Sequence, residues 1–526
     1  MRRIQILDST LRDGAQAEGV SFSVNDKLNI CRALDEFGVD YIEAGNPVSN
    51  PKDAEFFRAA GELNLKNAKL CAFGSTRRPG VAPEEDASLC ALAASGAPAV
   101  TLVGKAWDRQ VTEVLGISLE ENLELVSSSI AYLASLGLEV IFDAEHFFDG
   151  WMANREYTLS VIRSAAFSGA STVTLCDTNG GNLPFEIYMV TKEVVTLLDG
   201  VNVAIHCHND TGCAVANSMA GVYGGANQVQ GTFIGIGERC GNANLSTIIP
   251  NLVIKSAYSC SCNVAQLFDA ARHIAEISNV NLPNNRPYIG SSAFAHKGGM
   301  HIDAVLKNPA TFEHIDPELV GNKRRLLTSE VSGRSAITPR LQSIAPELTR
   351  DSPEIARILA ALKESERLGY SYEAAEASLD IMVMKMLGTY RPHFRLVFYK
   401  TMGEFPAPPG ELSAFASVKI EVDGRTETTA ETGAGPVNAL DLALRKALRV
   451  FYPDIADMKM TDYKVRVLEQ NSSTVARVRV LMESCDGQDT WTTVGVSNDV
   501  LEASLTALVD AIEFKLSKTD SETATL

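Results

Sequence analysis

Val203-Ala204-Ile205-His206-Cys207-His208-Asn209-Asp210 is a short β-rich apolar run that ends in a cluster of polar residues. Before residue 260, seven other segments have the same form, and amphipathic helical stretches separate the runs. These seven runs lie at residues 4–7, 41–44, 70–73, 100–103, 139–142, 172–175 and 229–233. Eight such units in about 250 residues predict an α/β fold of the (β/α)₈ type, the TIM barrel. A doubly wound sheet is the alternative, but it usually needs fewer strands.

The pattern changes twice after the barrel. A turn-rich connector at 281–287 leads into loops and helices, and from about 410 strands and helices alternate in the order strand, helix, strands, helix. The second pattern is typical of an α+β module, whose low content of catalytic residue types suggests regulation or assembly. We therefore expect a catalytic barrel at 1–280, a mainly helical linker at 281–405, a C-terminal regulatory domain at 406–518 and a disordered tail at 519–526.

Composition excludes some classes of function. The 526 residues include 65 Asp and Glu against 47 Lys and Arg, a net charge of −18, which disfavours nucleic acid as the main partner. We find no stretch of about 18 uncharged apolar residues, so no membrane span is predicted and we expect a cytoplasmic protein. The ten cysteines form no C-x-x-C pair, which argues against a structural zinc site or a disulfide framework.

The barrel prediction directs attention to the carboxyl ends of the strands, where active sites of this fold lie. His206 and His208 are two residues apart on a strand, so both imidazoles face the same side. Asp8 at the end of the first run offers a carboxylate, and Asn242 after the eighth offers an amide oxygen. These four residues suit a divalent Mg, Mn or Zn ion acting as a Lewis acid. The alternative is a pair of hydrogen-bonded histidines near a barrel mouth.

Four further residues are candidates for catalysis or substrate binding. Arg12 is suited to stabilise an alkoxide or bind a carboxylate, unless it only pairs with Asp13 in a loop. Thr178 offers a hydroxyl to a substrate carboxylate, although its D-T-N-G context is also a turn sequence, and Glu145 is a candidate base or orienting group. His301 follows two glycines outside the barrel and is either an acid/base group or a surface histidine.

Four motifs together resemble the barrel enzymes that carry out Claisen condensations of acetyl-CoA, namely the 2-isopropylmalate, homocitrate and citramalate synthases. The motifs are DSTLRDG (8–14), LCDTNG (175–180), HCHND (206–210) and GERCGN (237–242). The resemblance continues through His301 in the linker to GPVNALD (435–441) in the C-terminal domain. Five segments are most similar to one citramalate synthase branch: GAQ (14–16), GVSFS (19–23), SNPKD (49–53), HIDPELVGN (314–322) and WTTVGVS (491–497).

The resemblance implies an acyltransferase of isoleucine biosynthesis that condenses pyruvate with acetyl-CoA. Asp8, His206, His208 and Asn242 would hold the ion, most simply Mg or Mn, with Arg12 polarising the keto oxygen. Thr178 would bind the carboxylate, and Glu145 and His301 would transfer protons. It also implies a homodimer whose linker histidines enter the partner subunit's barrel, and isoleucine as an effector at the C-terminal domain.

Three departures from the family pattern affect substrate choice and rate. Phe312 stands where relatives usually carry a tyrosine, Ile234 replaces a common asparagine, and Asn46 takes a position that is usually aromatic. The alternatives are therefore a 2-isopropylmalate synthase, a homocitrate synthase, a hydroxyacyl-CoA lyase or a non-catalytic relative. The candidates for the CoA phosphates are Lys105, Lys297, Arg324 and Arg325.

Overall fold

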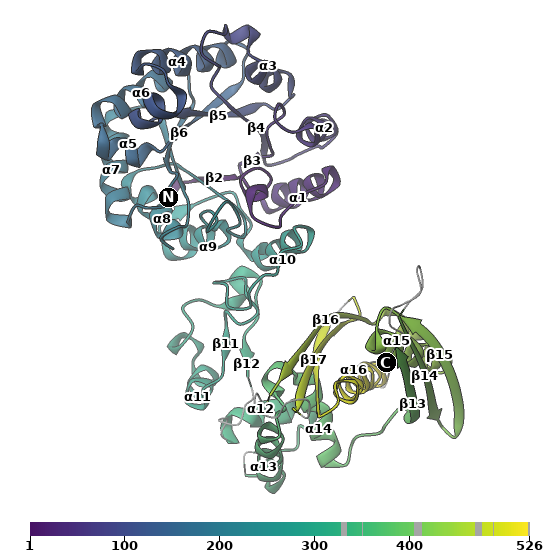
Figure 1. Cartoon of the computed structure of the whole chain (residues 1–526). Helices are drawn as coiled ribbons and strands as arrows, with labels where there is room; N and C mark the ends of the chain where they lie inside the picture. The colour runs from purple at the N-terminus through teal and green to yellow at the C-terminus, as the bar shows by residue number, and fades with distance from the viewer. Residues whose placement is uncertain (328–333, 350, 404–412, 469–475, 488, 524–526) are drawn as a thin grey trace. The chain divides into compact units, whose positions relative to one another are not determined.

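The computed structural model describes residues 1–327, 334–349, 351–403, 413–468, 476–487 and 489–523 (Figure 1). The chain divides into two compact units, each described here by itself. The first unit comprises Met1–Phe294 and Ile315–Arg324, and the second comprises Ala295–His314 and Arg325–Leu526. Among the described helices, none combines the length and the apolar character that a membrane crossing requires.

The first unit contains the predicted barrel. Eight parallel strands follow one another in sequence order, and the last pairs with the first to close the ring (Figure 1). The strands are β2 Gln5–Asp8, β3 Tyr41–Glu43, β4 Lys69–Ser75, β5 Ala99–Lys105, β6 Glu139–Glu145, β7 Thr172–Asp177, β8 Asn202–Cys207 and β9 Gln228–Gly231. Each of the eight apolar runs in the sequence forms one of these strands, so the prediction of the fold class is confirmed.

Helices surround the strand ring. They are α1 Val24–Phe37, α2 Pro51–Ala60, α3 Ala87–Ala94, α4 Leu119–Ser135, α5 Phe147–Ala153, α6 Arg155–Phe167, α7 Pro184–Leu197, α8 Ala214–Gly224, α9 Leu245–Pro250 and α10 Leu267–Ile277. Helix α1 shows how the local sequence sets these bounds. Ser23 and Asp26 form a reciprocal capping box at its start, and Gly38 adopts the left-handed conformation (φ 94°) that ends it.

Alternation along the strands decides which side chains reach the barrel interior. Leu7, Tyr41, Cys71, Ala99 and Ile141 form a small cluster inside the ring. Their strand neighbours belong instead to the large core between strands and helices, as Ile6 and Ile42 do. Because successive strand residues point to opposite faces, a residue two positions beyond an interior one also faces inward.

A buried ion pair fixes the loop between β3 and α2 at the carboxyl end of the barrel. Lys27 on α1 donates to Asp53 Oδ1 and, at 2.7 Å, to the carbonyl of Ala44. The other carboxylate oxygen of Asp53 accepts from the backbone N–H of Asn46 at 2.9 Å. A Cβ on Gly45 would lie 2.3 Å from Asp53, so the loop can close around the carboxylate only with glycine there.

Lys27→Met is expected to lower the free energy of unfolding of the first unit by about 3–5 kcal/mol, because Asp53 would remain buried without its counter-ion. Chemical unfolding followed by barrel tryptophan fluorescence measures the change. Lys66→Met, at an exposed position, is the control, with an expected change within about 0.5 kcal/mol. A loss for Lys27→Met no larger than the control would show that the pair does not hold the loop.

The second unit begins with the linker. Its elements are β11 Ala295–His296, α11 Gly299–Lys307, β12 Arg325–Leu326, α12 Arg334–Ile344, α13 Pro353–Arg367 and α14 Glu376–Leu387. Helices α12, α13 and α14 agree with the helices expected in this region. Residues 315–324 interrupt the linker and belong to the barrel unit, where Val320 joins the barrel core.

The C-terminal part contains two three-stranded antiparallel sheets and two helices. One sheet consists of β13 Arg395–Gly403, β14 Ala414–Val422 and β15 Arg425–Gly433, followed by α15 Pro436–Leu448. The other consists of β16 Lys459–Val467, β17 Val478–Cys485 and β18 Thr490–Ser497, followed by α16 Val500–Thr523. Side chains from both sheets and both helices share one core.

Two expected boundaries shift. Strand β13 pairs with β14 although it lies inside the predicted linker at 281–405, so the C-terminal domain begins before residue 406. Helix α16 runs to Thr523 and therefore includes residues 519–523 of the tail expected to be disordered, while 524–526 lie outside the described residues. The sequence interpretation also missed β15 and β18.

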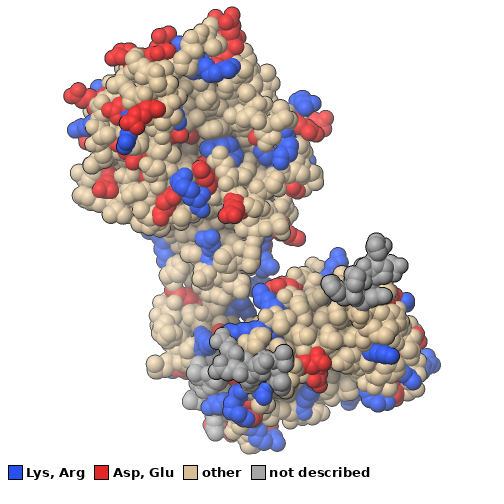
Figure 2. All heavy atoms as spheres, in the orientation of Figure 1, with Lys and Arg blue, Asp and Glu red and all other residues tan. Residues whose placement is uncertain are grey.

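Charged side chains of both signs are interspersed on the face of the barrel unit that Figure 2 shows. The net charge of −18 is therefore compatible with local basic groups. The barrel mouth is where a site for an anionic ligand is expected.

Candidate active site

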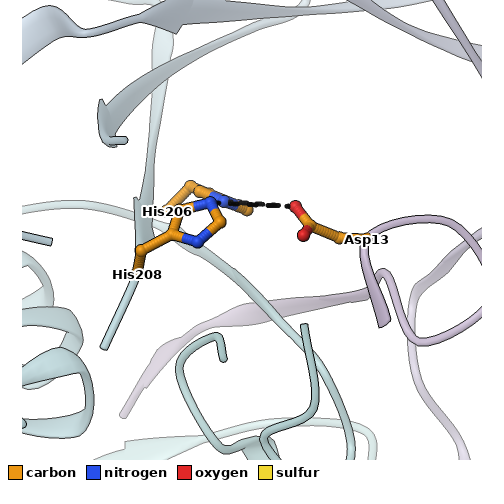
Figure 3. Close-up of side chains that lie close together, drawn as sticks. All are labelled: Asp13, His206 and His208. Carbon is orange, nitrogen blue, oxygen red and sulfur yellow. Dashed lines mark ion pairs between the residues drawn. The ribbon is translucent and has the colours of Figure 1, made fainter. Parts of the chain in front are cut away.

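Asp13, His206 and His208 form a buried cluster at the carboxyl ends of the barrel strands (Figure 3). His206 lies on β8 and faces inward because its neighbours Ile205 and Cys207 belong to the outer core. Asp13 Oδ2 lies 3.7 Å from Nε2 of His206 and 3.9 Å from Nε2 of His208. Within the described residues, this is the group of acidic and histidine side chains close enough to share a metal ion.

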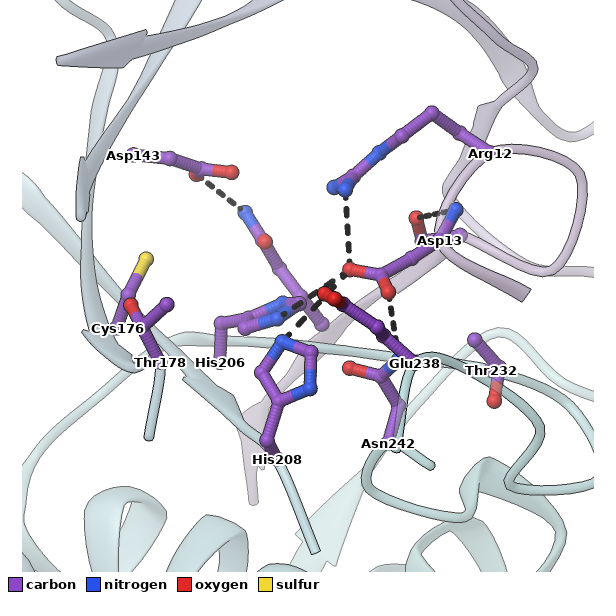
Figure 4. Close-up of polar contacts among 12 residues, drawn as sticks. Arg12, Asp13, Asp143, Cys176, Thr178, His206, His208, Thr232, Glu238 and Asn242 are labelled. Atoms are coloured by element: carbon purple, nitrogen blue, oxygen red, sulfur yellow. Dashed lines mark hydrogen bonds and ion pairs between the residues drawn. The ribbon is translucent and has the colours of Figure 1, made fainter. Parts of the chain in front are cut away.

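Asn242 completes the cluster. Its Nδ2 donates to Asp13 Oδ1 at 2.9 Å, and it bridges to His208 through the backbone (Figure 4). A Cβ on Gly237 would lie 2.1 Å from this Nδ2, so glycine at 237 gives the amide its space. The Oδ1 of Asn242 is buried and has no hydrogen-bond partner among the described residues. An unpartnered oxygen beside a carboxylate and two imidazoles fits a divalent cation.

The protonation states of the cluster also suit a metal ion. Burial opposes ionisation of Asp13, but the charge of Arg12, together with the charges of His206 and His208 when these are protonated at low pH, outweighs it and lowers the pKa of Asp13 to about 2. Burial, followed by the neighbouring His206, lowers the pKa of His208 to about 4, and burial lowers the pKa of His206 as well. At neutral pH the carboxylate is therefore ionised and both imidazoles are neutral, the forms that bind metals.

The structure does not place Asp8 in this cluster, which corrects the expectation that Asp8 binds the ion. Asp8 is the last residue of β2, and Leu7 before it faces the barrel interior, so the Asp8 side chain points to the opposite face. Its carboxylate accepts from the backbone N–H of Thr10 at 2.8 Å and from the Thr10 hydroxyl at 3.0 Å. Asp8 therefore shapes the turn that presents Arg12 and Asp13.

Asp8→Asn is expected to gain stability relative to the unmodified protein as pH rises from 5 to 8, by about 2 kcal/mol. Burial raises the pKa of Asp8 from 3.8 to about 7, so the stability that its protonated form contributes is lost as pH rises through this range. Asparagine does not titrate. Unfolding midpoints of both proteins across this range measure the change, and a constant difference between them would contradict it.

Arg12 lies against Asp13 (Figure 4). Two further residues, Glu43 and Phe73, also hold it. Its Nε donates to Glu43 at 2.6 Å, its Nη1 donates to Asp13 at 3.0 Å, and its guanidinium carbon lies 4.0 Å from the centre of the Phe73 ring. Burial disfavours the charge, but Glu43 and Asp13 outweigh it and raise the pKa of Arg12 above its usual range. The guanidinium is thus a fixed positive group beside the cluster.

Thr178 and Glu145 lie on neighbouring strand ends of the same barrel mouth. The Thr178 hydroxyl accepts from the backbone N–H of His146 at 2.8 Å, so its own hydrogen remains available to donate. Glu145 is paired with Lys105. Because the charge of Lys105 is already paired with this carboxylate, Lys105 is a weaker candidate for binding the CoA phosphates.

The other candidates are divided between the two units. His301 lies on α11 of the second unit, with its ring centre 4.3 Å from that of Phe312. Lys297 and Arg325 also lie in the second unit and pair with Glu373 and Glu376, whereas Arg324 belongs to the first.

Sequence reasoning missed the roles of Asp13, Glu43 and Gln230. Alternation along β2 could have indicated the role of Asp13. It directs the Asp8 side chain away from the barrel interior, whereas the same rule directs His206 and His208 into it. Glu43 and Gln230 are inward-facing polar residues on β3 and β9. The contacts that each of them makes with other residues depend on the closure of the barrel.

A closed (β/α)₈ barrel with an Asp-His-His cluster and a largely buried arginine at the carboxyl ends of its strands fits the class of barrel enzymes that use a divalent metal ion. Three family models match the chain in order: HMGL-like at 3–274, the homocitrate synthase post-HMGL domain-like family at 288–368, and the LeuA allosteric (dimerisation) domain at 373–516.

The chain is similar over nearly its whole length to curated proteins. It is 49% identical to an (R)-citramalate synthase of Aquifex aeolicus, covering 99% of both chains. It is 47% identical to an (R)-citramalate synthase of a Synechocystis species, covering 97% of this chain and 96% of the other. It is 34% identical to a probable 2-isopropylmalate synthase of Methanopyrus kandleri, covering 97% and 98%. The chain belongs to the (R)-citramalate synthase family.

Proposed function

We propose that the chain condenses pyruvate with acetyl-CoA and water to give (R)-citramalate and CoA, a reaction that supplies isoleucine biosynthesis. The observation that carries the proposal is its 43–49% identity with five (R)-citramalate synthases over at least 97% of the chain. The enzyme is an acyltransferase. A cytoplasmic location, expected from the sequence, stays a prediction.

We assign the metal site to Asp13, His206, His208 and Asn242. A divalent ion held there, most simply Mg or Mn with Zn as the alternative, would act as a Lewis acid toward the keto and carboxylate oxygens of the 2-oxoacid. The support is the short distances from Asp13 to both imidazoles and the unpartnered Asn242 Oδ1.

Arg12 is placed to bind the keto oxygen and the alkoxide that replaces it. Nε and Nη1 are engaged by Glu43 and Asp13, and among the described residues Nη2 has no hydrogen-bond partner. This free donor strengthens its bond as negative charge develops on the oxygen, so it stabilises the transition state more than the ground state. Thr178 donates its hydroxyl hydrogen to the 2-oxoacid carboxylate, while the N–H of His146 fixes the hydroxyl oxygen.

Glu145 and His301 serve the proton transfers. The methyl group of acetyl-CoA loses a proton, and the resulting enolate attacks the keto carbon of pyruvate. The alkoxide then takes up a proton, and water hydrolyses the thioester to release CoA. Phe312 lies against His301 and has no hydroxyl, so we assign no proton transfer to position 312.

Thiol release from acetyl-CoA, measured with purified protein and separate 2-oxoacids, tests the proposed reaction. Pyruvate is expected to give the highest kcat/KM. Preference for 2-oxoisovalerate would indicate a 2-isopropylmalate synthase, and preference for 2-oxoglutarate a homocitrate synthase. Absence of release with every 2-oxoacid would contradict the proposal, and cleavage of a hydroxyacyl-CoA by the same protein would then favour a lyase.

We also propose a homodimer in which His301 of the partner subunit completes each active site. The support is the match to the LeuA allosteric (dimerisation) domain and the linker motif at His301. Mixing subunits of Asp13→Asn and His301→Ala, each inactive alone, tests the sharing. Random reassortment should restore about a quarter of the original activity, because half of the dimers are mixed and one of their two sites is intact. No recovery after confirmed subunit exchange would contradict shared sites.

Isoleucine is the proposed effector of the C-terminal domain, supported by the allosteric family that matches residues 373–516. Inhibition curves with isoleucine, and with leucine as the control, test this assignment in the full chain. Stronger inhibition by leucine, or none by either, would contradict it.

A further inference from the structure

We propose that Gln230 is a positioning residue for the metal site, which holds the His206 ring through its side-chain carbonyl oxygen and is itself fixed by Asp143 and Thr174. The inference rests on the proposed metal site. It concerns three inward-facing polar residues to which the reaction above gives no role.

Gln230 and His206 are direct neighbours across two barrel strands. His206 on β8 is in register with Gln230 on β9. Both face the barrel interior, because Ile205 and Val229, which precede them, belong to the outer core. Registered residues on adjacent strands lie about 4.8 Å apart, so their side chains are within reach of each other.

Two acceptors fix which way the Gln230 amide points. Its Nε2 donates to Asp143 Oδ1 at 3.0 Å and to Thr174 Oγ1 at 2.9 Å. An amide nitrogen has two hydrogens, and both are used by these bonds. The orientation of the amide is thereby set, and Oε1 can only be the acceptor of a further bond. In Figure 4, Asp143 and His206 lie on the same side of the barrel mouth.

The two atoms left over are chemically complementary. Gln230 Oε1 and His206 Nδ1 are both buried, and neither has a hydrogen-bond partner among the described residues. The other ring nitrogen of His206, Nε2, faces Asp13 at 3.7 Å. A neutral imidazole that donates its Nδ1 hydrogen to Gln230 directs the lone pair of Nε2 toward Asp13, which is the tautomer a metal ligand needs.

Burial of the two acceptors supports this pairing. Asp143 and Thr174 are fully buried or nearly so, which makes them rigid anchors for the amide.

Mn²⁺ affinity of the full-length protein, measured by electron paramagnetic resonance of free Mn²⁺, tests the role without relying on turnover. Gln230→Leu keeps the size of the side chain but removes the acceptor, and it is expected to weaken Mn²⁺ binding about 10–100-fold. The matched control is Gln228→Leu. Gln228 is also fully buried and inward-facing on β9, but it is in register with Ala204. The Gln228→Leu substitution should leave the Mn²⁺ affinity unchanged.

Unchanged Mn²⁺ affinity in folded Gln230→Leu, or an equal loss in both glutamine variants, would overturn the proposal. If Gln230→Leu does not fold, Thr174→Val decides: it frees one hydrogen of the amide and should give a smaller loss of affinity, whereas no loss overturns the proposal. His206→Ala distinguishes a failure of the proposed metal site from a failure of the positioning role. If His206→Ala binds Mn²⁺ normally, the proposed metal site is wrong. If it loses binding while Gln230→Leu keeps it, only the positioning role fails.

Discussion

Asp13→Asn is expected to abolish measurable Mn²⁺ binding and to lower turnover by about 10³-fold, whereas Asp8→Asn retains both. A bound cation contributes several kcal/mol of transition-state stabilisation, and each 1.36 kcal/mol corresponds to about a factor of ten in rate. Asp13 is the ionised group of the cluster, with a pKa of about 2, so asparagine removes the negative charge that faces both imidazoles.

Asp8→Asn is the matched control because the substitution is the same, both carboxylates are buried and both lie in the DSTLRDG segment. Isothermal titration with Mn²⁺ and thiol release with saturating pyruvate measure the two effects in each variant. Loss of Mn²⁺ binding in Asp8→Asn with retention in Asp13→Asn would return the ligand role to Asp8. Equal losses in both variants would show that the segment as a whole, rather than one carboxylate, determines binding.

The barrel was predictable from the sequence because its strands are largely buried and most of them contain a short apolar run. The C-terminal strands were less predictable for the opposite reason. Strand β15, RTETTAETG, contains no large apolar residue, so its sequence has no apolar run that would indicate a strand. Strand β13 begins at Arg395, within a segment otherwise read as helices and loops.

The sequence predicted which strand ends form the candidate site, but it did not predict which side chains contact each other there. The i, i+2 rule placed His206 and His208 correctly on one side, and the same rule excludes Asp8. The contacts of Glu43 with Arg12, and of Gln230 with Asp143, join residues far apart in sequence. Their register follows from the stagger at which the barrel closes, which no local pattern encodes.

Arg12→Lys is expected to lower kcat by about 10²–10³-fold with a smaller change in KM for pyruvate, although the positive charge is kept. A lysine ammonium cannot bond Glu43 and Asp13 through two nitrogens and still offer a third donor toward the keto oxygen, as the guanidinium does. The loss therefore falls on the step in which charge develops on that oxygen.

Arg77→Lys is the matched control for Arg12→Lys. Arg77 is also a buried arginine after a barrel strand, but it bonds Ser128, Glu124 and the carbonyl of Val81, which belong to the barrel exterior. Its substitution should leave kcat within a few-fold of the original value, because no charge develops near it during the reaction. Steady-state kinetics with pyruvate and Mn²⁺ titrations distinguish the possible causes. If Arg12→Lys raises KM and leaves kcat unchanged, Arg12 serves ground-state binding of the 2-oxoacid, since an interaction of equal strength in both states does not accelerate the chemical step.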